Sequence, residues 1–420
     1  MATRLACRLI IQVAPSGLEN NLVLGENHAS LRNPWAARAS ILLGVAWVAA
    51  GYWIHAAAGR EAAFAWIVGG IFGFTLQRSR FCFFCNFRDF FEKRNTEGVL
   101  AILIALAVGL VGYHVITNAW IIDPSAGHLP PKAHVAPIGW HLALGGLLFG
   151  AGMGLSGSCI SAHFYRLGEG TLAGLLALAG VVLGIVIALL FWNPVYLNWI
   201  HGKPAIWLPV SLGFAGSLFL QLAVIAGLAF WVWQRGRPGE LAGSTPRSWS
   251  TVAQALGRQR WPAWAGGIAV GLIGVAVLLR LEPLGVTSEL SRLARHLGNA
   301  AGWLPERLEG LDAIRGCAAH AADGFWSNGL IFLIALVLTA LAGALFAGEF
   351  VWEVPRFRGA VLALVGGVLL GAGSTYAAGC TIGTFLSGIH ASALSGWAFG
   401  FPTLIGALLA WPLRKRWLGL

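Results

Sequence analysis

The stretch GLLFGAGMGLSGSCISAHF at 146–164 recurs, without a gap, as GVLLGAGSTYAAGCTIGTF at 367–385. Each copy is a glycine-rich apolar run that ends in a cysteine, Cys159 in the first copy and Cys380 in the second. Small residues let helices approach closely in a membrane, and glycine tolerates the backbone of an interrupted helix. One copy alone would indicate a helix-packing motif. Two aligned copies, each with a thiol at its end, indicate a duplicated functional element.

The composition indicates a membrane protein. Hydrophobic residues make up 57% of the chain and charged residues 11%, whereas a soluble domain carries about 25% charged residues. The net charge of +11 does not indicate nucleic-acid binding, because the Lys and Arg residues sit in short loops between apolar runs. Six scattered cysteines are too few for a secreted disulfide framework.

Ten apolar segments follow a polar N-terminal arm. They cover about 41–58, 62–77, 99–117, 139–159, 171–192, 209–233, 263–281, 328–347, 359–379 and 394–413. Several are near or below the ~20 residues that a helix needs to cross a bilayer. Short, Gly-interrupted segments in matching positions of two halves indicate broken or re-entrant helices at a transport site. We therefore expect an all-α polytopic membrane protein with about 8–10 spans, some segments entering the bilayer only partway.

The two copies divide the chain into two halves. The expected parts are an N-terminal arm at 1–38, a first transmembrane repeat at 39–233, a cytoplasmic linker at 234–262, and a second transmembrane repeat at 263–420 with a polar insertion at 282–327. Five apolar segments separate Cys159 from Cys380, and an odd number turns the second copy over relative to the first. The pattern predicts two inverted-topology repeats related by an axis in the membrane plane.

The basic residues predict the orientation of the chain. Lys and Arg gather at 78–94, at 234–262 and at the C-terminus, whereas 118–138 and 193–208 hold one lysine each. Basic loops stay on the cytoplasmic side. We therefore expect a multi-pass protein of the bacterial inner membrane with both termini in the cytoplasm.

Cys82 and Cys85 form a C-x-x-C pair flanked by Arg80 and Arg88. A zinc site would need two further ligands at the usual spacing, which this stretch lacks. A thioredoxin-type redox pair would need a βαβ context, which is also missing. The plain alternative is an ordinary basic boundary between a span and the cytoplasm.

The polar residues beside the copies are more typical of structure than of catalysis. Arg166 and Glu169 lie in a Gly-bounded turn between two spans, and His163 and His390 are expected to be satisfied polar residues rather than ligands. The chain has no P-loop, dinucleotide fingerprint, nucleophile elbow or HExxH motif. We therefore expect no enzyme activity, no cofactor and no metal.

A set of short motifs resembles one family. They are RFCF at 80–83, FRD at 87–89, GSC at 157–159 leading into FYRLGEG at 164–170, PLGVT at 283–287, and AGCTIG at 378–383 with LSG at 386–388. Together they resemble the YeeE/YedE family of bacterial inner-membrane proteins, which is linked to uptake of thiosulfate and related sulfur compounds. The resemblance covers most of 41–413. It implies a central path on which Cys82, Cys159 and Cys380 engage the sulfur end of the substrate, and a cytoplasmic sulfur carrier of the TusA type as partner.

The chain departs from the family pattern in three places. Cys85 stands where a small residue is usual, Ser158 replaces a glycine, and both the N-terminal arm and the insertion at 288–327 are additional. A second thiol at Cys85 would change which sulfur species is preferred or add redox sensitivity. The secondary substrate contacts that we expect are Cys85, Arg80, Arg88, Arg166, Gly157 and Gly379.

The chemistry of thiosulfate agrees with such a path. Thiosulfate is a tetrahedral dianion with one soft sulfur end. A thiol in apolar surroundings stays protonated, so it can donate S–H to this sulfur without adding repulsive charge. Half-helix N-termini at glycine breaks supply partial positive charge to the oxygens. Inward movement of a dianion opposes the membrane potential by roughly 4.6 kcal/mol per 100 mV, so uptake needs a coupled cation or removal of the substrate inside.

Other function classes remain open from the sequence. A membrane thiol–disulfide oxidoreductase would exchange disulfides among the cysteines and would need Cys85 as much as Cys82. A passive anion channel or a structural subunit would not need the thiols at all. A transporter of a selenium compound or another small anion would share the same architecture. The sequence leaves open the sulfur compound, the coupling ion and the oligomeric state.

Overall fold

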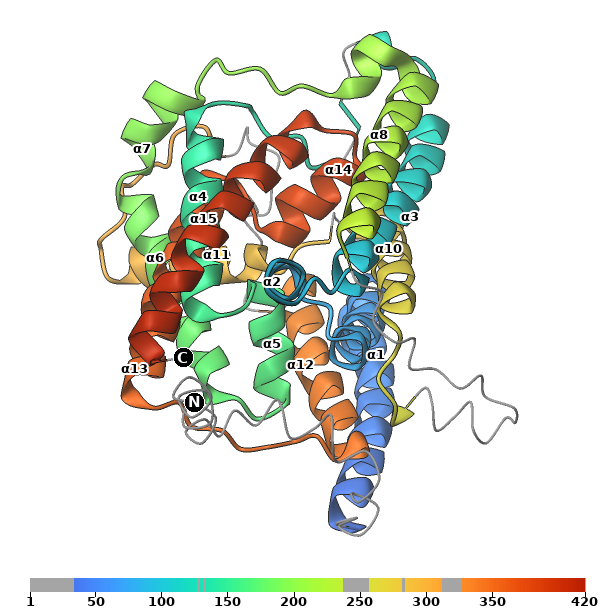
Figure 1. Cartoon of the computed structure of the whole chain (residues 1–420), viewed down its shortest axis with the longest axis vertical. Helices are drawn as coiled ribbons and strands as arrows, with labels where there is room; N and C mark the ends of the chain where they lie inside the picture. The colour runs from blue at the N-terminus through green and yellow to red at the C-terminus, as the bar shows by residue number, and fades with distance from the viewer. Residues whose placement is uncertain are drawn as a thin grey trace, which may run out of the picture.

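The computed structural model describes residues 34–126, 129–130, 133–236, 257–281, 284–311 and 326–419 (Figure 1). Within these residues the chain is helical, without any β-strand, and nine helical stretches are long and apolar enough to cross a membrane. They contain α1 (Pro34–Ser79), α3 (Glu97–Trp120), α4 (Trp140–Ser156), α6 (Leu172–Leu190), α8 (Leu208–Arg235), α10 (Ala263–Arg280), α12 (Asn328–Ala347), α13 (Phe357–Tyr376) and α15 (Leu394–Leu418). The all-α polytopic class is confirmed. In hydrocarbon each backbone amide must be paired within its own helix, which is why these apolar runs are helical.

Shorter helices lie between the long ones. They are α2 (Phe83–Lys93), η2 (Pro124–Ala126), α5 (Ile160–Gly168), α7 (Trp192–Val195), η3 (Tyr196–Ile200), α11 (Thr287–Ala300), η5 (Thr381–Ser387) and α14 (Gly388–His390). Two expectations were wrong here. The basic stretch at 78–94 is largely the helix α2, with Phe83, Phe84 and Phe90 buried, rather than a surface loop. The residues around Arg166 form the helix α5 rather than a turn.

The helix α1 is a hairpin. Gly59 has non-helical backbone angles (φ 87°, ψ −173°) inside this 46-residue run. Trp66 Nε1 donates a 2.8 Å hydrogen bond to the carbonyl oxygen of Trp47, 19 positions away. On a straight helix these positions would be about 28 Å apart. The chain therefore turns back at Gly59, and the two arms are the apolar segments expected at 41–58 and 62–77.

Glycines of the two copies lie where long helices touch. α4 packs against α15, α13 packs against α6, and α4 and α13 pack against each other. A methyl group on Gly150 or on Gly371 would overlap a backbone carbonyl oxygen of the facing helix, and one on Gly152 would lie 2.6 Å from the carbonyl oxygen of Gly366. The glycines thus permit the close helix contacts that the sequence predicts.

Replacing Gly150 with alanine should therefore destabilise the protein. The added methyl group would overlap the carbonyl oxygen of Thr403, which belongs to a helix backbone and cannot move without separating α4 from α15. Overpacking of this kind costs about 1–3 kcal/mol. The measurement is the midpoint of thermal unfolding in detergent. Gly227→Ala in α8 is the matched control, because no atom lies within 4 Å of its added methyl group. Equal midpoints for the two variants would contradict the packing argument.

A buried ion pair fastens the loop after α12 to the end of α1. Arg78 Nη2 lies 2.5 Å from Glu349 Oε2, and the Arg78 side chain is 0% exposed. Gln77 also donates to Glu349, at 2.9 Å. The other Arg78 nitrogens donate to Gln77 Oε1 at 2.6 Å and to the carbonyl oxygen of Arg258 at 3.1 Å. Arg260 adds a second, more exposed cation 3.1 Å from the same carboxylate.

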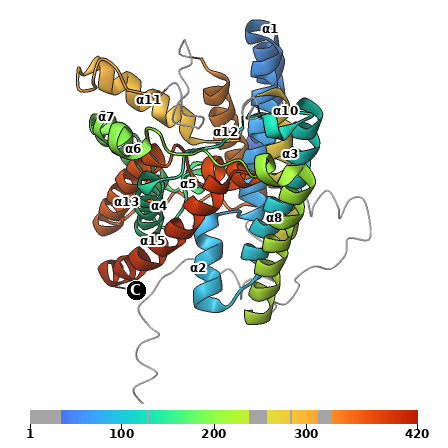
Figure 2. The same cartoon turned by 90° about the horizontal axis from the view of Figure 1, so that it is seen from above.

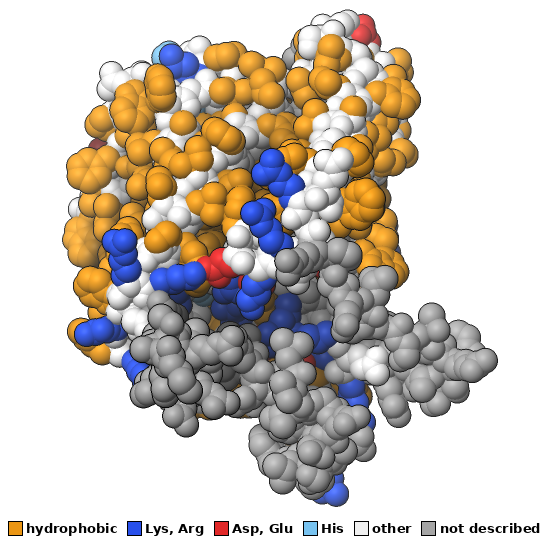
Figure 3. Space-filling view, viewed as in Figure 1, with side chains coloured by type: hydrophobic (Ala, Val, Ile, Leu, Met, Phe, Trp, Pro, Cys, Tyr) orange, Lys and Arg blue, Asp and Glu red, His pale blue; other side chains and the backbone are white. Residues whose placement is uncertain are grey.

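The surface of the molecule separates apolar from basic areas. In the view of Figure 3 the upper part is mostly hydrophobic, and Lys and Arg gather in the lower part. α11 lies at the edge of the bundle in Figure 2, against α6 and α12. The N-terminal arm up to residue 33, most of the linker at 234–262 and Cys317 of the insertion lie outside the described residues.

Candidate functional site

Three helix breaks share one geometry. Each has a residue with positive φ two positions before a cysteine: Arg80 (49°), Gly157 (86°) and Ala378 (55°). The cysteine that follows has extended backbone angles and is the N-cap of a short helix: Cys82 of α2, Cys159 of α5 and Cys380 of η5. The first N–H groups of a helix lack intrahelical partners and carry partial positive charge. Each of these thiols therefore sits at a helix end that favours an anion.

The fold brings two of these thiols together. Cys159 Sγ donates to Cys82 Sγ at 3.9 Å, and Cys159 Sγ also lies 3.2 Å from Ser161 Oγ. Cys82 Sγ accepts the backbone N–H of Cys85 at 3.5 Å. Cys82 and Cys159 are both 0% exposed and free of disulfides. The contact joins α2 to α5, which come from opposite ends of the α3–α4 segment (Figure 1).

Cys380 lies at the third break, also buried and unbonded to another cysteine. It forms no hydrogen bond with another thiol in the part of the chain that the structure describes. Its helix η5 contacts α2 through the rings of Phe385 and Phe83, whose centroids are 5.9 Å apart. Gly379, just before Cys380, has φ 159°, and a side chain there would meet Thr384 Oγ1 at 2.6 Å.

Cys85 faces an arginine. Arg166 Nη2 donates to Cys85 Sγ at 3.4 Å, and Cys85 Sγ lies 3.9 Å from the carbonyl oxygen of Gly157. The sequence suggested an Arg166–Glu169 pair, but Glu169 instead accepts a 3.3 Å hydrogen bond from Gln77. Arg166 lies in the last turn of α5, and this helical position directs its side chain to the Cys85 thiol.

The other expected arginines differ in their position. Arg88 pairs with Asp89 at 2.7 Å and lies over the ring of Trp411, 5.5 Å from its centroid. Arg80 provides the left-handed backbone of the first break, and its side chain is exposed. Sequence reasoning missed Arg414 as a site residue. Its guanidinium lies against Gly157, where a Cβ would meet it at 2.9 Å; the only signal was its place in the C-terminal basic run.

The histidines beside the breaks have structural partners. His163 Nε2 hydrogen-bonds with Ser156 Oγ at 3.1 Å, and His390 Nε2 with the carbonyl oxygen of Ala105 at 3.1 Å. Among the described residues, no group of three or more His, Cys, Asp or Glu side chains is placed to hold a metal ion.

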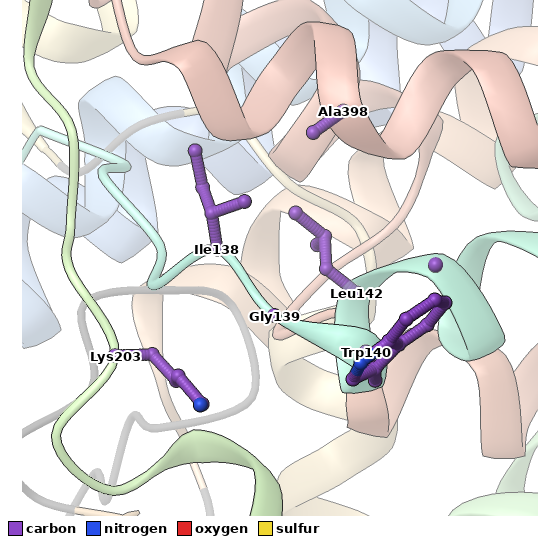
Figure 4. A pocket seen from close by; sticks show the side chains of 7 residues that line it. Ile138, Gly139, Trp140, Leu142, Lys203 and Ala398 are labelled. Carbon is purple, nitrogen blue, oxygen red and sulfur yellow. The ribbon is translucent and has the colours of Figure 1, made fainter.

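A pocket lies at the other end of α4 (Figure 4). Its volume is about 350 Å³, and it is lined by Ile138, Gly139, Trp140, Leu142, Ala143, Lys203 and Ala398. Trp140 begins α4 and Ser156 ends it, which separates the pocket from the first copy's cysteine by about 24 Å along the helix. Lys203, the single cation of its loop, stands at the side of this mostly apolar pocket (Figure 4).

Comparison with known proteins identifies the family. The family model described as sulphur transport, which covers the YeeE/YedE proteins, matches residues 78–409. The chain belongs to this family. The match begins near the end of α1 and includes all three cysteine breaks.

Relatives of the family carry transporter names. The chain is 25% identical over 359 residues to the thiosulfate transporter TsuA of Spirochaeta thermophila, covering 83% of this chain and 98% of that protein. It is 25% identical over 349 residues to TsuA of Escherichia coli, covering 79% and 87%. The probable transporter YedE of Escherichia coli is 30% identical over 129 residues, 31% of this chain and 30% of YedE. The chain is therefore a multi-pass membrane protein and a transporter of a sulfur compound.

Proposed function

We propose that this protein takes up thiosulfate, or a closely related sulfur anion, along a path lined by neutral thiols. The observation that carries the proposal is the contact of Cys82 with Cys159 at two helix N-termini, 3.9 Å between the sulfurs. The sulfur end of the substrate exchanges S–H hydrogen bonds with successive thiols, and the helix ends face its oxygens. Cys380, at a third N-cap, is the remaining thiol of the path.

The residues expected as secondary substrate contacts lie next to the thiols of this path. Gly157 and Gly379 place no side chain beside the neighbouring thiols, and Cys85 with Arg166 adds a further thiol and a cation. Arg88 and Arg80 contribute positive charge. These roles are assigned on position and chemistry, and TsuA relatives at 25% identity make thiosulfate the first candidate.

We propose an inverted repeat in the inner membrane, with both termini in the cytoplasm. Support comes from the way the halves exchange partners: α4 packs on α15 while α13 packs on α6, and α1 packs on α12 while α10 packs on α3. A two-fold axis between the halves produces such an exchange.

The number of spans supports placing both termini on the same side of the membrane. Counting the two arms of α1 separately gives ten spans among the described residues, and an even number returns the chain to the side on which it began. An alkaline phosphatase fused after residue 419 should be inactive; an active fusion would contradict this orientation.

The deciding experiment is uptake of labelled thiosulfate in a bacterial strain without other sulfate or thiosulfate importers. Expression of the chain should restore accumulation, and excess unlabelled thiosulfate should abolish it. Coexpression of a TusA-type sulfur carrier should raise accumulation, because removing the substrate inside offsets the potential that opposes a dianion. No accumulation at normal membrane expression would contradict the proposal.

A matched pair of alanine variants tests the role of the C-x-x-C stretch. Cys82→Ala should abolish most uptake, because Cys82 contacts Cys159 on the path. Cys85→Ala should leave much of the uptake intact, because the Cys85 thiol is outside the Cys82–Cys159 contact and the cation beside it, Arg166, remains. Both variants are measured as initial uptake rates per amount of protein in the membrane.

Equal loss in the two variants would favour the alternative function, a thiol–disulfide oxidoreductase. The geometry that favours this alternative is the N-cap position of Cys82 with Cys85 three residues on, plus a third thiol at 3.9 Å. Such an enzyme would show disulfides among these cysteines during turnover, whereas a neutral-thiol path keeps them reduced.

A further inference from the structure

Arginines from two helices meet beside Gly157, and a third lies nearby. Arg166 of α5 donates to Cys85 Sγ at 3.4 Å. Arg414 of α15 lies against Gly157 and donates to the carbonyl oxygen of Leu155 at the end of α4. Arg88 of α2 lies over the ring of Trp411, which is one turn before Arg414 on α15. Because Gly157 has no side chain, the arginine of α15 can approach the break directly.

The charges in this cluster are unbalanced. Asp89 pairs with Arg88 at 2.7 Å. Within the residues that the structure describes, neither Arg166 nor Arg414 forms an ion pair with a carboxylate. Like charges held close together in a partly buried place repel each other, and an anion between them relieves this repulsion. The cluster therefore has the electrostatics of an anion site rather than of a structural ion-pair network.

The arginine cluster is distinct from the contact between the Cys82 and Cys159 thiols. Cys85 connects the two, since its backbone N–H meets Cys82 Sγ and its sulfur faces Arg166. The pocket beside Lys203 lies at the opposite end of α4. Arg414 begins the C-terminal basic run, which marks the cytoplasmic side. Arg88, Arg166 and Arg414 are each partly exposed.

We infer that Cys85, Arg166 and Arg414 form a second anion site, on the cytoplasmic side of the Cys82–Cys159 pair, which receives the sulfur anion before release. The inference rests on the proposed function. Guanidinium forks match the oxygens of a tetrahedral oxyanion, and the Cys85 thiol offers a soft contact to its sulfur end. The ligand class is thus a divalent oxyanion that carries a terminal sulfur. Arg88, neutralised by Asp89, contributes only at longer range.

Uptake kinetics give the first test. Arg166→Gln and Arg414→Gln should each lower the maximal rate of thiosulfate uptake by about tenfold, because a charge-assisted contact to the anion is lost. The external KM should change little, since the outer end of the path is untouched. Arg416→Gln is the matched control, with the same charge change on an exposed neighbour of Arg414, and should transport like the wild type. Unchanged maximal rates in both cluster variants would overturn the inference.

Thiol protection gives a second test that does not depend on transport. In inside-out vesicles, peptide mass spectrometry follows the rate at which a small anionic methanethiosulfonate reagent modifies Cys85, which is 9% exposed. A wild-type Cys85 that does not react from this side would overturn the inner site, because an anion could not reach it. Thiosulfate should slow this modification in the wild type and in Arg416→Gln but not in Arg166→Gln or Arg414→Gln. Absence of protection in a wild type that transports thiosulfate would overturn the inner site and leave the proposed function standing. Failure of the wild type to transport at all would overturn the proposed function instead.

Should either glutamine variant fail to reach the membrane, Arg166→Lys and Arg414→Lys replace them. Lysine keeps the charge but loses the planar fork. Protection should then be weakened and the maximal rate partly restored. Full wild-type protection with both lysine variants would overturn the assignment of the guanidinium forks to the oxygens of the anion.

Discussion

Cys159→Ser and Cys380→Ser should each lower thiosulfate uptake by about 5- to 150-fold, which corresponds to one lost contact worth ~1–3 kcal/mol. The reason is chemical softness rather than size. A hydroxyl is nearly isosteric with a thiol, but it binds water and oxyanions at least as well as a sulfur end. Selectivity for the sulfur terminus should therefore fall together with the rate.

Folding should survive these two substitutions. Both cysteines are N-caps, and serine is a favoured residue at this position. Cys159 Sγ already lies 3.2 Å from a hydroxyl, Ser161 Oγ, so a polar group is tolerated there. The measurement is growth on thiosulfate as sole sulfur source, with the membrane content of each variant quantified and growth on cysteine as control. Full growth of either variant at normal expression would refute the thiol path.

Glu349→Ala should cause the largest loss of stability. It leaves the guanidinium of Arg78, whose side chain is 0% exposed, without its anion. Breaking a buried pair by removing one partner costs about 3–5 kcal/mol. We expect little folded protein, measured as the monodisperse fraction in detergent and as resistance to proteolysis. Glu309→Ala is the control, because its pair with Arg307 is long, at 3.8 Å, and largely exposed; such pairs contribute about 0–1 kcal/mol.

A double variant distinguishes the buried charge from simple loss of contacts. Arg78→Met combined with Glu349→Leu removes both charges, and replacing a buried ion pair by apolar residues is often neutral or stabilising. The double variant should therefore recover part of the folded fraction lost in Glu349→Ala. A double variant less stable than the single one would show that the hydrogen bonds of Arg78 to Gln77 and to the Arg258 carbonyl matter more than the charge.

The long helices could be predicted from the sequence because hydropathy alone determines them. The segment expected at 328–347 is α12, and the break expected between 58 and 62 is Gly59. The short helices α2 and α5 could not be predicted in this way. α2 is amphipathic and carries charged residues, and the breaks before Cys82 and Cys380 use Arg80 and Ala378, residue types that rarely adopt positive φ.

The candidate site was only partly accessible from the sequence. The repeated copies and the family resemblance pointed to Cys82, Cys159 and Cys380, and the roles of these residues stay predictions. The direction of Arg166 could not be foreseen, because it depends on α5 being a helix. Arg414 lies 259 positions from Leu155, which it contacts. Only the packing of α15 on α4 brings such distant residues together.

The hairpin of α1 has a consequence for how the chain enters the membrane. Its second arm packs on α12 through Gly69 and Gly73, whereas most of the first arm faces outward, with Leu42, Val48 and Trp53 exposed. The family match begins only at residue 78. Because each span reverses the direction of the chain, deleting 34–58 alone would require the new N-terminus to lie on the opposite side of the membrane, if the remaining spans keep their orientation. The first arm of α1 thus adds little to the core, but it sets the orientation of all the spans that follow it.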